Sequence, residues 1–287
     1  MTEVRRTTSF VRAVVLSGAV AVSIAGVRLY LLTDHTERLF AWTIAVPLSA
    51  TFLGAFYLTA VPLALHSARA PTWAQARLPV PGVLVFLWVT LATTLLHLSK
   101  FHLHSTDAVA RWAAILWVAI YVLDPPVLTA ALLLQLRAPG EDPPRTHPLP
   151  HAFRTALGVY GAGLLFVGVA LFAAPNWTAR WWPWSLTPLT ARAMSAWVLT
   201  IAVMFAQAVW ENDWSRIRPG VRTVALLAAL QLLAVARYRA AVDWSPRGWI
   251  YVAVLLGAAA ISAFGWMGSQ SPAPNASVRG TASDRQV

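Results

Sequence analysis

The 287-residue chain contains no cysteine, a single lysine and only 11 acidic residues against 22 basic ones. Without cysteine, disulfides, thiol redox chemistry and cysteine-ligated metal sites are excluded. The sequence also lacks a P-loop, a glycine-rich dinucleotide motif, an H-E-x-x-H zinc motif and a G-x-S-x-G nucleophile motif. No catalytic residue can therefore be assigned from a motif. We predict neither a cofactor nor a bound metal, and these absences weigh against an enzyme.

Apolar residues make up 58% of the chain and charged residues 11%, with a mean hydropathy of +0.60. This composition predicts an all-α integral membrane protein, since a membrane-spanning helix needs about 20 apolar residues. We expect eight transmembrane helices, at residues 10–32, 41–65, 79–99, 111–136, 154–174, 188–210, 220–237 and 248–267.

The formal net charge of +11 comes from basic residues placed singly at the ends of these stretches. This spacing favours membrane lipid headgroups as partners and argues against nucleic acid. An Ala-rich chain with arginine in place of lysine is typical of a high-GC bacterium, which indicates the cytoplasmic (inner) membrane. The positive-inside rule predicts that both termini are cytoplasmic.

The second half of the sequence resembles the first, which predicts an internal duplication. The aligned pairs include Arg12 with Arg154, Gly26 with Gly168, Trp42 with Trp184, Pro47 with Pro188 and Trp112 with Trp249. Each half has four spans, so the two tandem four-helix repeats share one parallel orientation across the membrane.

The expected organisation has four parts. The prolines of the central connection predict a spacer, and the small and polar residues after the last span predict disorder. The parts are a first repeat at 1–137, a Pro-rich cytoplasmic linker at 138–153, a second repeat at 154–268 and a disordered cytoplasmic tail at 269–287.

Most tryptophans lie near the ends of the predicted spans, where amphipathic indoles prefer the headgroup level. We interpret Trp42 and Trp184 as interface anchors. Pro47 and Pro188 then mark helix starts, so that both motifs are structural and not catalytic.

Asp124 lies near the middle of a predicted span, where a carboxylate costs about 2.5 to 3.5 kcal/mol on insertion scales. It must therefore be paired or protonated, and we expect the neutral form. Pro125 and Pro126 follow it and predict a kink or break. The matching position in the second half is Ile261, so Asp124 is a candidate ligand-binding residue. The structural alternative is a kink whose carboxyl bonds Tyr121 or a buried water, and Tyr121 is itself a candidate.

Arg192 is a second candidate, in the first turns of a helix for which Thr187 is the predicted N-cap and Pro188 a first-turn residue. A cation there opposes the helix dipole, so helix stability does not explain it. Arg192 either pairs with Asp124 across the repeats or extends to lipid phosphate.

Two polar clusters lie at predicted span ends. His97, Lys100, His102 and His104 cluster at the outer end of the third span, but their spacing puts no two histidines on one helical face. Interfacial polar residues are the better reading than a metal or haem site, with His97 kept as a ligand-binding candidate. The turn 211–213 either caps a helix or docks a partner, and capping is the commoner use.

Each half resembles the four-helix membrane repeats of the DoxX-like group. The resemblance is carried by a helix beginning near Arg154 with Gly161 and Gly168, a connection with Ala174 and Pro175, and a helix opening with Ala191 and Arg192. It implies a four-helix architecture for each half. It carries over no functional residue and does not cover the tandem arrangement or Asp124.

We therefore expect a multi-pass membrane protein that binds or passes a small hydrophobic or amphiphilic molecule through a polar cavity between the repeats, open to the outer leaflet. One alternative is a membrane-embedded enzyme that acts on a lipid or isoprenoid, with Asp124 as an acid. Another is a scaffold or assembly protein that binds a membrane-protein partner.

Overall fold

The computed structural model describes residues 3–268, which form helices joined by loops, with two isolated β-bridges and no strand in that range. The all-α prediction is confirmed. The predicted tail, 269–287, lies outside the described residues. The long helices are α1 (Ser9–Leu31), α3 (Pro47–Arg69), α5 (Val80–Leu96), α6 (Ala108–Leu136), α7 (His151–Ala173), α9 (Pro188–Glu211), α10 (Trp214–Arg237) and α11 (Pro246–Gly268). The short helices are α2 (Thr36–Leu39), α4 (Trp73–Ala76) and α8 (Pro175–Thr178).

Seven helices of the described region are long and apolar enough to cross a membrane, where eight spans were expected. The eighth of the long helices, α5, has only 17 residues. At 1.5 Å per residue it covers about 25 Å of a hydrocarbon core of about 30 Å. The chain after Leu96 turns into two 3-10 segments instead of continuing the helix. The architecture is that of a multi-pass helical membrane protein.

Several helix starts follow the capping rules. The side chains of Thr8, Asp107, Thr187 and Asp213 each accept a hydrogen bond from a backbone N–H in the first turn of α1, α6, α9 and α10. The predicted cap at Thr187, with Pro188 as the first residue of α9, is confirmed. For the turn 211–213 the structure shows the capping use, by Asp213.

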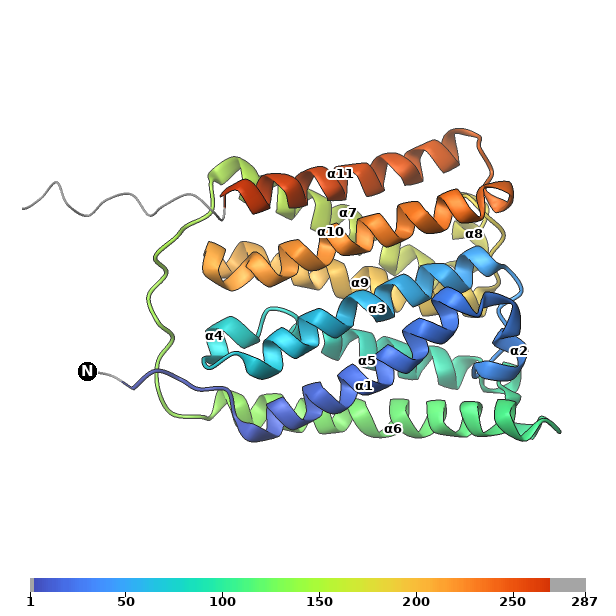
Figure 1. Cartoon of the computed structure of the whole chain (residues 1–287), viewed down its shortest axis with the longest axis horizontal. Coiled ribbons are helices and arrows are strands. Elements are labelled where there is room, and N and C mark those ends of the chain that lie inside the picture. Colours follow the sequence, from blue (N-terminus) through green and yellow to red (C-terminus); the bar gives the residue numbers. More distant parts are fainter. Residues whose placement is uncertain (1–2, 269–287) are drawn as a thin grey trace, which may run out of the picture.

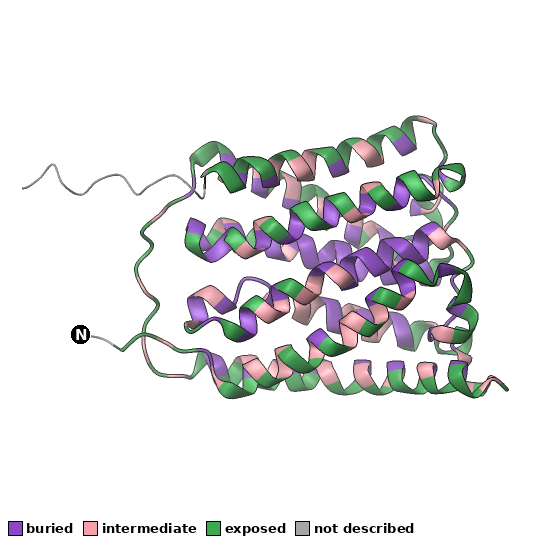
Figure 2. Ribbon diagram, in the orientation of Figure 1, coloured by how far each residue is buried: buried purple, intermediate pink, exposed green. Residues whose placement is uncertain are grey.

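The helices form a bundle in which α3 and α9 are central (Figure 1). Helix α1 packs along α3, and α7 packs along α9. Helix α5 crosses to α9, whereas α10 crosses to α3, so each half of the chain packs its third long helix on the other half. Figure 2 shows the buried residues concentrated on α3 and α9, while α1, α6, α7 and α11 expose most of their surface. These exposed, apolar outer helices are the surface that a bilayer would cover.

Both described chain ends and the connection from α6 to α7 lie at one end of the bundle, here called the terminal end (Figure 1). The segment before α1 is held there by backbone hydrogen bonds to Glu141 and Pro71. The buried amide of Gln135 accepts from the Thr8 N–H at 2.7 Å and donates to the Arg6 carbonyl at 2.9 Å. The amino-terminal segment is therefore part of the packed structure.

Candidate functional site

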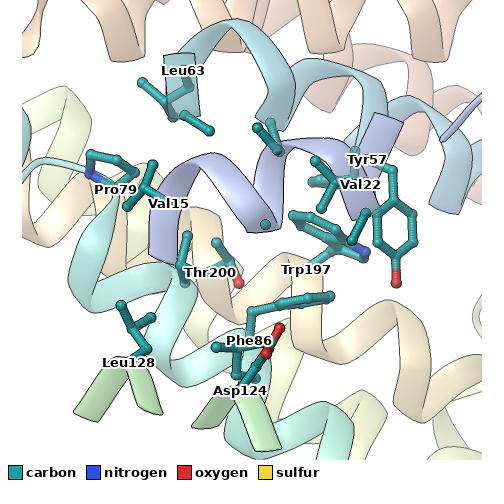
Figure 3. Close-up of a pocket in the computed structure, with 18 of the residues that line it drawn as sticks. Val15, Val22, Tyr57, Leu63, Pro79, Phe86, Asp124, Leu128, Trp197 and Thr200 are labelled. Atoms are coloured by element: carbon teal, nitrogen blue, oxygen red, sulfur yellow. The ribbon is translucent and has the colours of Figure 1, made fainter. Parts of the chain in front are cut away.

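A cavity of about 180 Å³ lies among α1, α3, α5 and α6 and is bounded on the far side by α9. Most of its lining is aliphatic or aromatic, as Figure 3 shows around Leu63, Phe86 and Trp197. The expectation of a polar cavity between the halves is therefore wrong in polarity and in position. The space lies mainly within the first four long helices, and it is apolar because these helices turn few polar side chains toward it.

Small residues on α1 help to leave this space open. Gly18, Ala21 and Ala25 all line the cavity, and a Cβ added at Gly18 would meet no heavy atom within 4 Å. Larger side chains here would project into the volume between α1 and α6. The cavity thus depends on the small side chains of α1 and on the neighbouring helices that enclose the space beside them.

Asp124 lies on α6 and contributes its carboxyl to the cavity lining (Figure 3). It is the one acidic or basic residue of that lining, and within residues 3–268 no group hydrogen-bonds or ion-pairs with its carboxyl. Helix α6 runs through Pro125 and Pro126 without a break, so of the expected kink or break the break is wrong and the kink stays a prediction. The carbonyls that lose their helical N–H donor are those of Tyr121 and Val122, because a proline four residues on has no N–H, whereas the Pro125 carbonyl accepts from the Thr129 hydroxyl at 2.7 Å.

Tyr121 is buried one turn before Asp124 and also lines the cavity. Its hydroxyl forms a 2.9 Å hydrogen bond with the hydroxyl of buried Tyr57 on α3. The interpretation that Tyr121 satisfies Asp124 is therefore wrong: Tyr121 pairs with another tyrosine. The structure brings the candidates Asp124 and Tyr121 to one cavity, and Tyr57 joins them from a helix the sequence had not singled out.

Arg192 and His97 lie together near the end of the bundle opposite the terminal end, and neither lines the cavity. The Arg192 Nε donates to the Phe172 carbonyl at 3.0 Å, and its Nη1 lies 2.8 Å from the His97 Nε2. The proposed pairing of Arg192 with Asp124 is thus wrong. Phe172 belongs to the last turn of α7, so the guanidinium complements the carboxyl end of that dipole while it opposes the amino end of α9.

The contact with Arg192 constrains the protonation of His97, the residue that follows α5. An arginine can only donate, so the His97 Nε2 must accept, and the ring must be neutral for this bond to form. Burial, and then the charges of Arg192 and Lys100, lower the pKa of His97. His97 is therefore held neutral by its surroundings.

The other histidines of this cluster separate in space. The His102 ring contacts the Phe40 carbonyl at 3.2 Å and the Thr43 hydroxyl at 3.0 Å. In the described region no three residues of the types His, Cys, Asp and Glu lie close enough together to hold a metal ion. The ring of His102 has a structural use in joining two connections.

The tryptophans divide into a buried group and an exposed group, and the two expected interface anchors belong to the buried group. Trp42 and Trp184 are buried. Trp184 donates to the Ser49 hydroxyl of α3 at 2.9 Å, and Trp42 packs edge-on against Trp117 at 5.0 Å. Both indoles are core residues because the connections that carry them fold over the helix ends. Exposed indoles occur at Trp88, Trp112, Trp177, Trp181, Trp210, Trp244, Trp249 and Trp266.

A buried ion-pair network at the terminal end was not predicted. Glu211 is fully buried and accepts hydrogen bonds from Arg77, Arg216 and Gln207. Arg77 also binds Asp142 of the connection before α7. Burial acts to lower the pKa of Arg77, but its bonds to Glu211 and Asp142 outweigh this and raise it. The acidic residue at the end of α9 was visible in the sequence, as were the nearby Gln207 and Arg216, but Arg77 comes from a distant segment.

The same network fixes the expected spacer to the bundle. The Asp213 carboxylate accepts from the backbone N–H groups of Thr146 and His147 at 2.8 and 3.1 Å. Burial acts to raise the pKa of Asp213, but the hydrogen bonds it accepts, first that of Ser215, lower it. Residues 141–149 are thus a docked connection.

Comparisons of this chain with protein-family models, with curated proteins and with solved structures find no match.

Proposed function

We propose that this multi-pass membrane protein binds a small amphiphilic molecule in the cavity beside α1, with the Asp124 carboxyl as the polar anchor. One observation carries the proposal: a carboxyl with no partner among residues 3–268 faces an apolar space large enough for a ligand. Asp124 is half-buried, and a carboxyl without a hydrogen-bond partner is costly in a membrane-spanning helix. A ligand that supplies a polar partner at one end and apolar surface elsewhere would remove this cost.

The size of the space sets the size of the ligand. An apolar protein cavity of about 150 Å³ accepts benzene. The cavity of about 180 Å³ would therefore accept one ring with a short substituent, or the end of a larger molecule. A long lipid would have to leave most of its length outside.

The two halves of the chain differ at this point, which supports a specialised site. We interpret them as a duplication with parallel orientation, from the aligned residue pairs and the four spans of each half, and the resemblance to DoxX-like repeats implies a four-helix architecture for each half. In the sequence alignment Gly18 matches Tyr160, and Asp124 matches Ile261. The Tyr160 hydroxyl donates to the Val254 carbonyl across the gap between α7 and α11. The space among α7, α9, α10 and α11 has a volume of only about 20 Å³.

The glycines at the helix contacts also fit the duplication. A Cβ on Gly26 of α1 would lie 2.9 Å from the Leu58 Cγ, and a Cβ on Gly168 of α7 would lie 2.7 Å from the Leu199 Cγ. These glycines are an aligned pair, and so are these leucines. We take α5 as the eighth span, shortened at its end, and the terminal end as the cytoplasmic side of the inner membrane, because the positive-inside rule favours it.

The cavity can be tested by filling it. Wild-type protein is purified in mild detergent beside Gly18→Phe and the matched control Gly163→Phe, which adds the same ring where α7 is exposed and also has no atom within 4 Å. Bound small molecules are extracted and identified by mass spectrometry. We expect a molecule that is retained by the wild type and the control and is lost from Gly18→Phe. An identical set of molecules in all three would contradict the proposal.

The enzyme and scaffold alternatives receive less support. An acid catalyst in this cavity would need a second ionisable partner, and Asp124 is the one acidic or basic residue of the lining. A scaffold that docks partners through the turn 211–213 would need accessible acids, yet Glu211 and Asp213 are buried.

A further inference from the structure

Resting on the proposed function, we infer that the ligand is a small organic cation with an apolar body, such as a protonated amine, and that it exchanges with a proton on Asp124. The cavity has the two features that recognise such a cation. It has one carboxyl that no other group binds within residues 3–268, and it is lined by several aromatic rings. Neutral apolar ligands would use the rings and leave the carboxyl unused.

The aromatic lining comes from four helices and contains Phe56, Tyr57, Phe86, Trp117, Tyr121 and Trp197. The rings form a continuous cluster, with centroids 4.1 Å apart for Phe86 and Trp197 and 4.4 Å apart for Trp117 and Tyr121. The faces of aromatic rings carry negative potential and attract ammonium groups, most strongly where water is excluded. Figure 3 shows Asp124 reaching from α6 toward Phe86, so that carboxyl and ring border the same space.

The charge distribution of the chain sharpens this assignment. Although the formal net charge is +11, no arginine, lysine or histidine among residues 3–268 lines the cavity. The basic candidate from the sequence, Arg192, is held by Phe172 and His97 away from the cavity. A ligand cation would therefore meet one acid and no competing base.

Binding and proton release balance. A carboxyl alone in an apolar membrane interior is held neutral, because its ionised form is poorly solvated there. When the ammonium ion enters, the carboxyl O–H bond breaks, the proton leaves to water, and the carboxylate pairs with the cation, whose N–H bonds stay intact. One positive charge enters and one leaves, so the charge within the membrane is unchanged. The exchange needs no further reactant.

The test compares benzylamine, which is cationic at neutral pH, with benzyl alcohol, its neutral analogue of nearly equal size. Both are titrated by calorimetry at pH 7.5 into the full chain in nanodiscs, with empty nanodiscs as the blank. Repeating the titration in buffers of different ionisation enthalpy counts released protons. We expect benzylamine to bind about tenfold more tightly or better, with about one proton released, as a desolvated cation contact implies.

Two variants separate the possible failures. Asp124→Asn should bind benzylamine no better than benzyl alcohol and release no proton, while the matched control Asp34→Asn, at an exposed position away from the cavity, should match the wild type. Gly18→Phe keeps the carboxyl and should bind neither compound. Equal affinities for both compounds in wild type, lost in Gly18→Phe, would overturn the cation assignment and keep the cavity. No binding of either compound to folded wild type would overturn both proposals.

Discussion

Replacing Glu211 by Gln tests whether the buried network at the terminal end stabilises the bundle. The carboxylate is fully buried and accepts four hydrogen bonds, two from Arg77 and one each from Arg216 and Gln207. The amide keeps the shape of the side chain but removes its charge and turns one acceptor into a donor. The buried guanidinium of Arg77 would then keep only the carboxylate of Asp142 as a charged partner, and that of Arg216 would keep the Pro143 carbonyl.

The expected cost is large for a single isosteric change. Removing one partner from a buried ion pair destabilises proteins by about 3 to 5 kcal/mol, because the other charge stays buried without compensation. Side-chain exposures of 8% for Arg77 and 4% for Arg216 place both cations in this regime. A solvent-exposed pair would instead contribute about 0 to 1 kcal/mol.

The measurement is reversible unfolding in mixed micelles with increasing sodium dodecyl sulfate, followed by tryptophan fluorescence. Asp34→Asn serves as the control for removing an exposed carboxylate. Arg77→Gln and the double variant complete a cycle, in which the double variant should lose less stability than the sum of the single variants. A loss below about 1 kcal/mol in Glu211→Gln, with additive single variants, would falsify the view that this network is desolvated and coupled.

Three further predictions concern helix packing and protonation. Pro188→Ala should lower the free energy of unfolding by about 0.4 to 1 kcal/mol, because alanine does not preset the first turn of α9; loss of ligand binding at unchanged stability would contradict this structural role. Gly54→Ala should destabilise by about 1 to 3 kcal/mol or more, since its Cβ would lie 2.5 Å from the Tyr30 backbone nitrogen, and an unchanged denaturation midpoint would refute the close approach of α1 and α3. The lowered pKa of His97 means that the folded state binds its proton less well than the unfolded state. Its contribution to stability is present above about pH 6.5 and is lost as the pH falls through the folded pKa; His97→Gln should flatten this part of the stability curve, and an unaltered curve would show that His97 does not cause it.

The sequence predicted the helical architecture well because apolar runs and capping residues act locally. The Thr187 and Pro188 start of α9 is an example in which two adjacent residues determine a boundary. The end of the third expected span was wrong, since the turn after Leu96 follows from packing of the next connection and not from a local breaker such as proline.

The candidate site could be predicted only in part. Asp124 stood out because an acidic residue in an apolar span is energetically costly, and the structure places it in the cavity lining. Arg192 stood out because a cation at a helix amino terminus opposes the helix dipole, but one of its partners is a backbone carbonyl of α7, a group that every residue possesses. The cavity itself arises from side chains that are missing at Gly18 and its neighbours on α1, and one sequence does not show which helices surround them.

The docking of the amino-terminal segment has a consequence for the order of assembly during synthesis. The amide of Gln135, which binds the backbone of Arg6 and Thr8, comes 127 residues after Thr8 in the chain. At about 5 to 20 residues per second, the ribosome needs roughly 6 to 25 s to add that length. The first turn of α1 is therefore made well before this partner exists. The bonds between this segment and Gln135 can form only after α6 has been made, whereas Pro71, which also holds the segment, is made earlier.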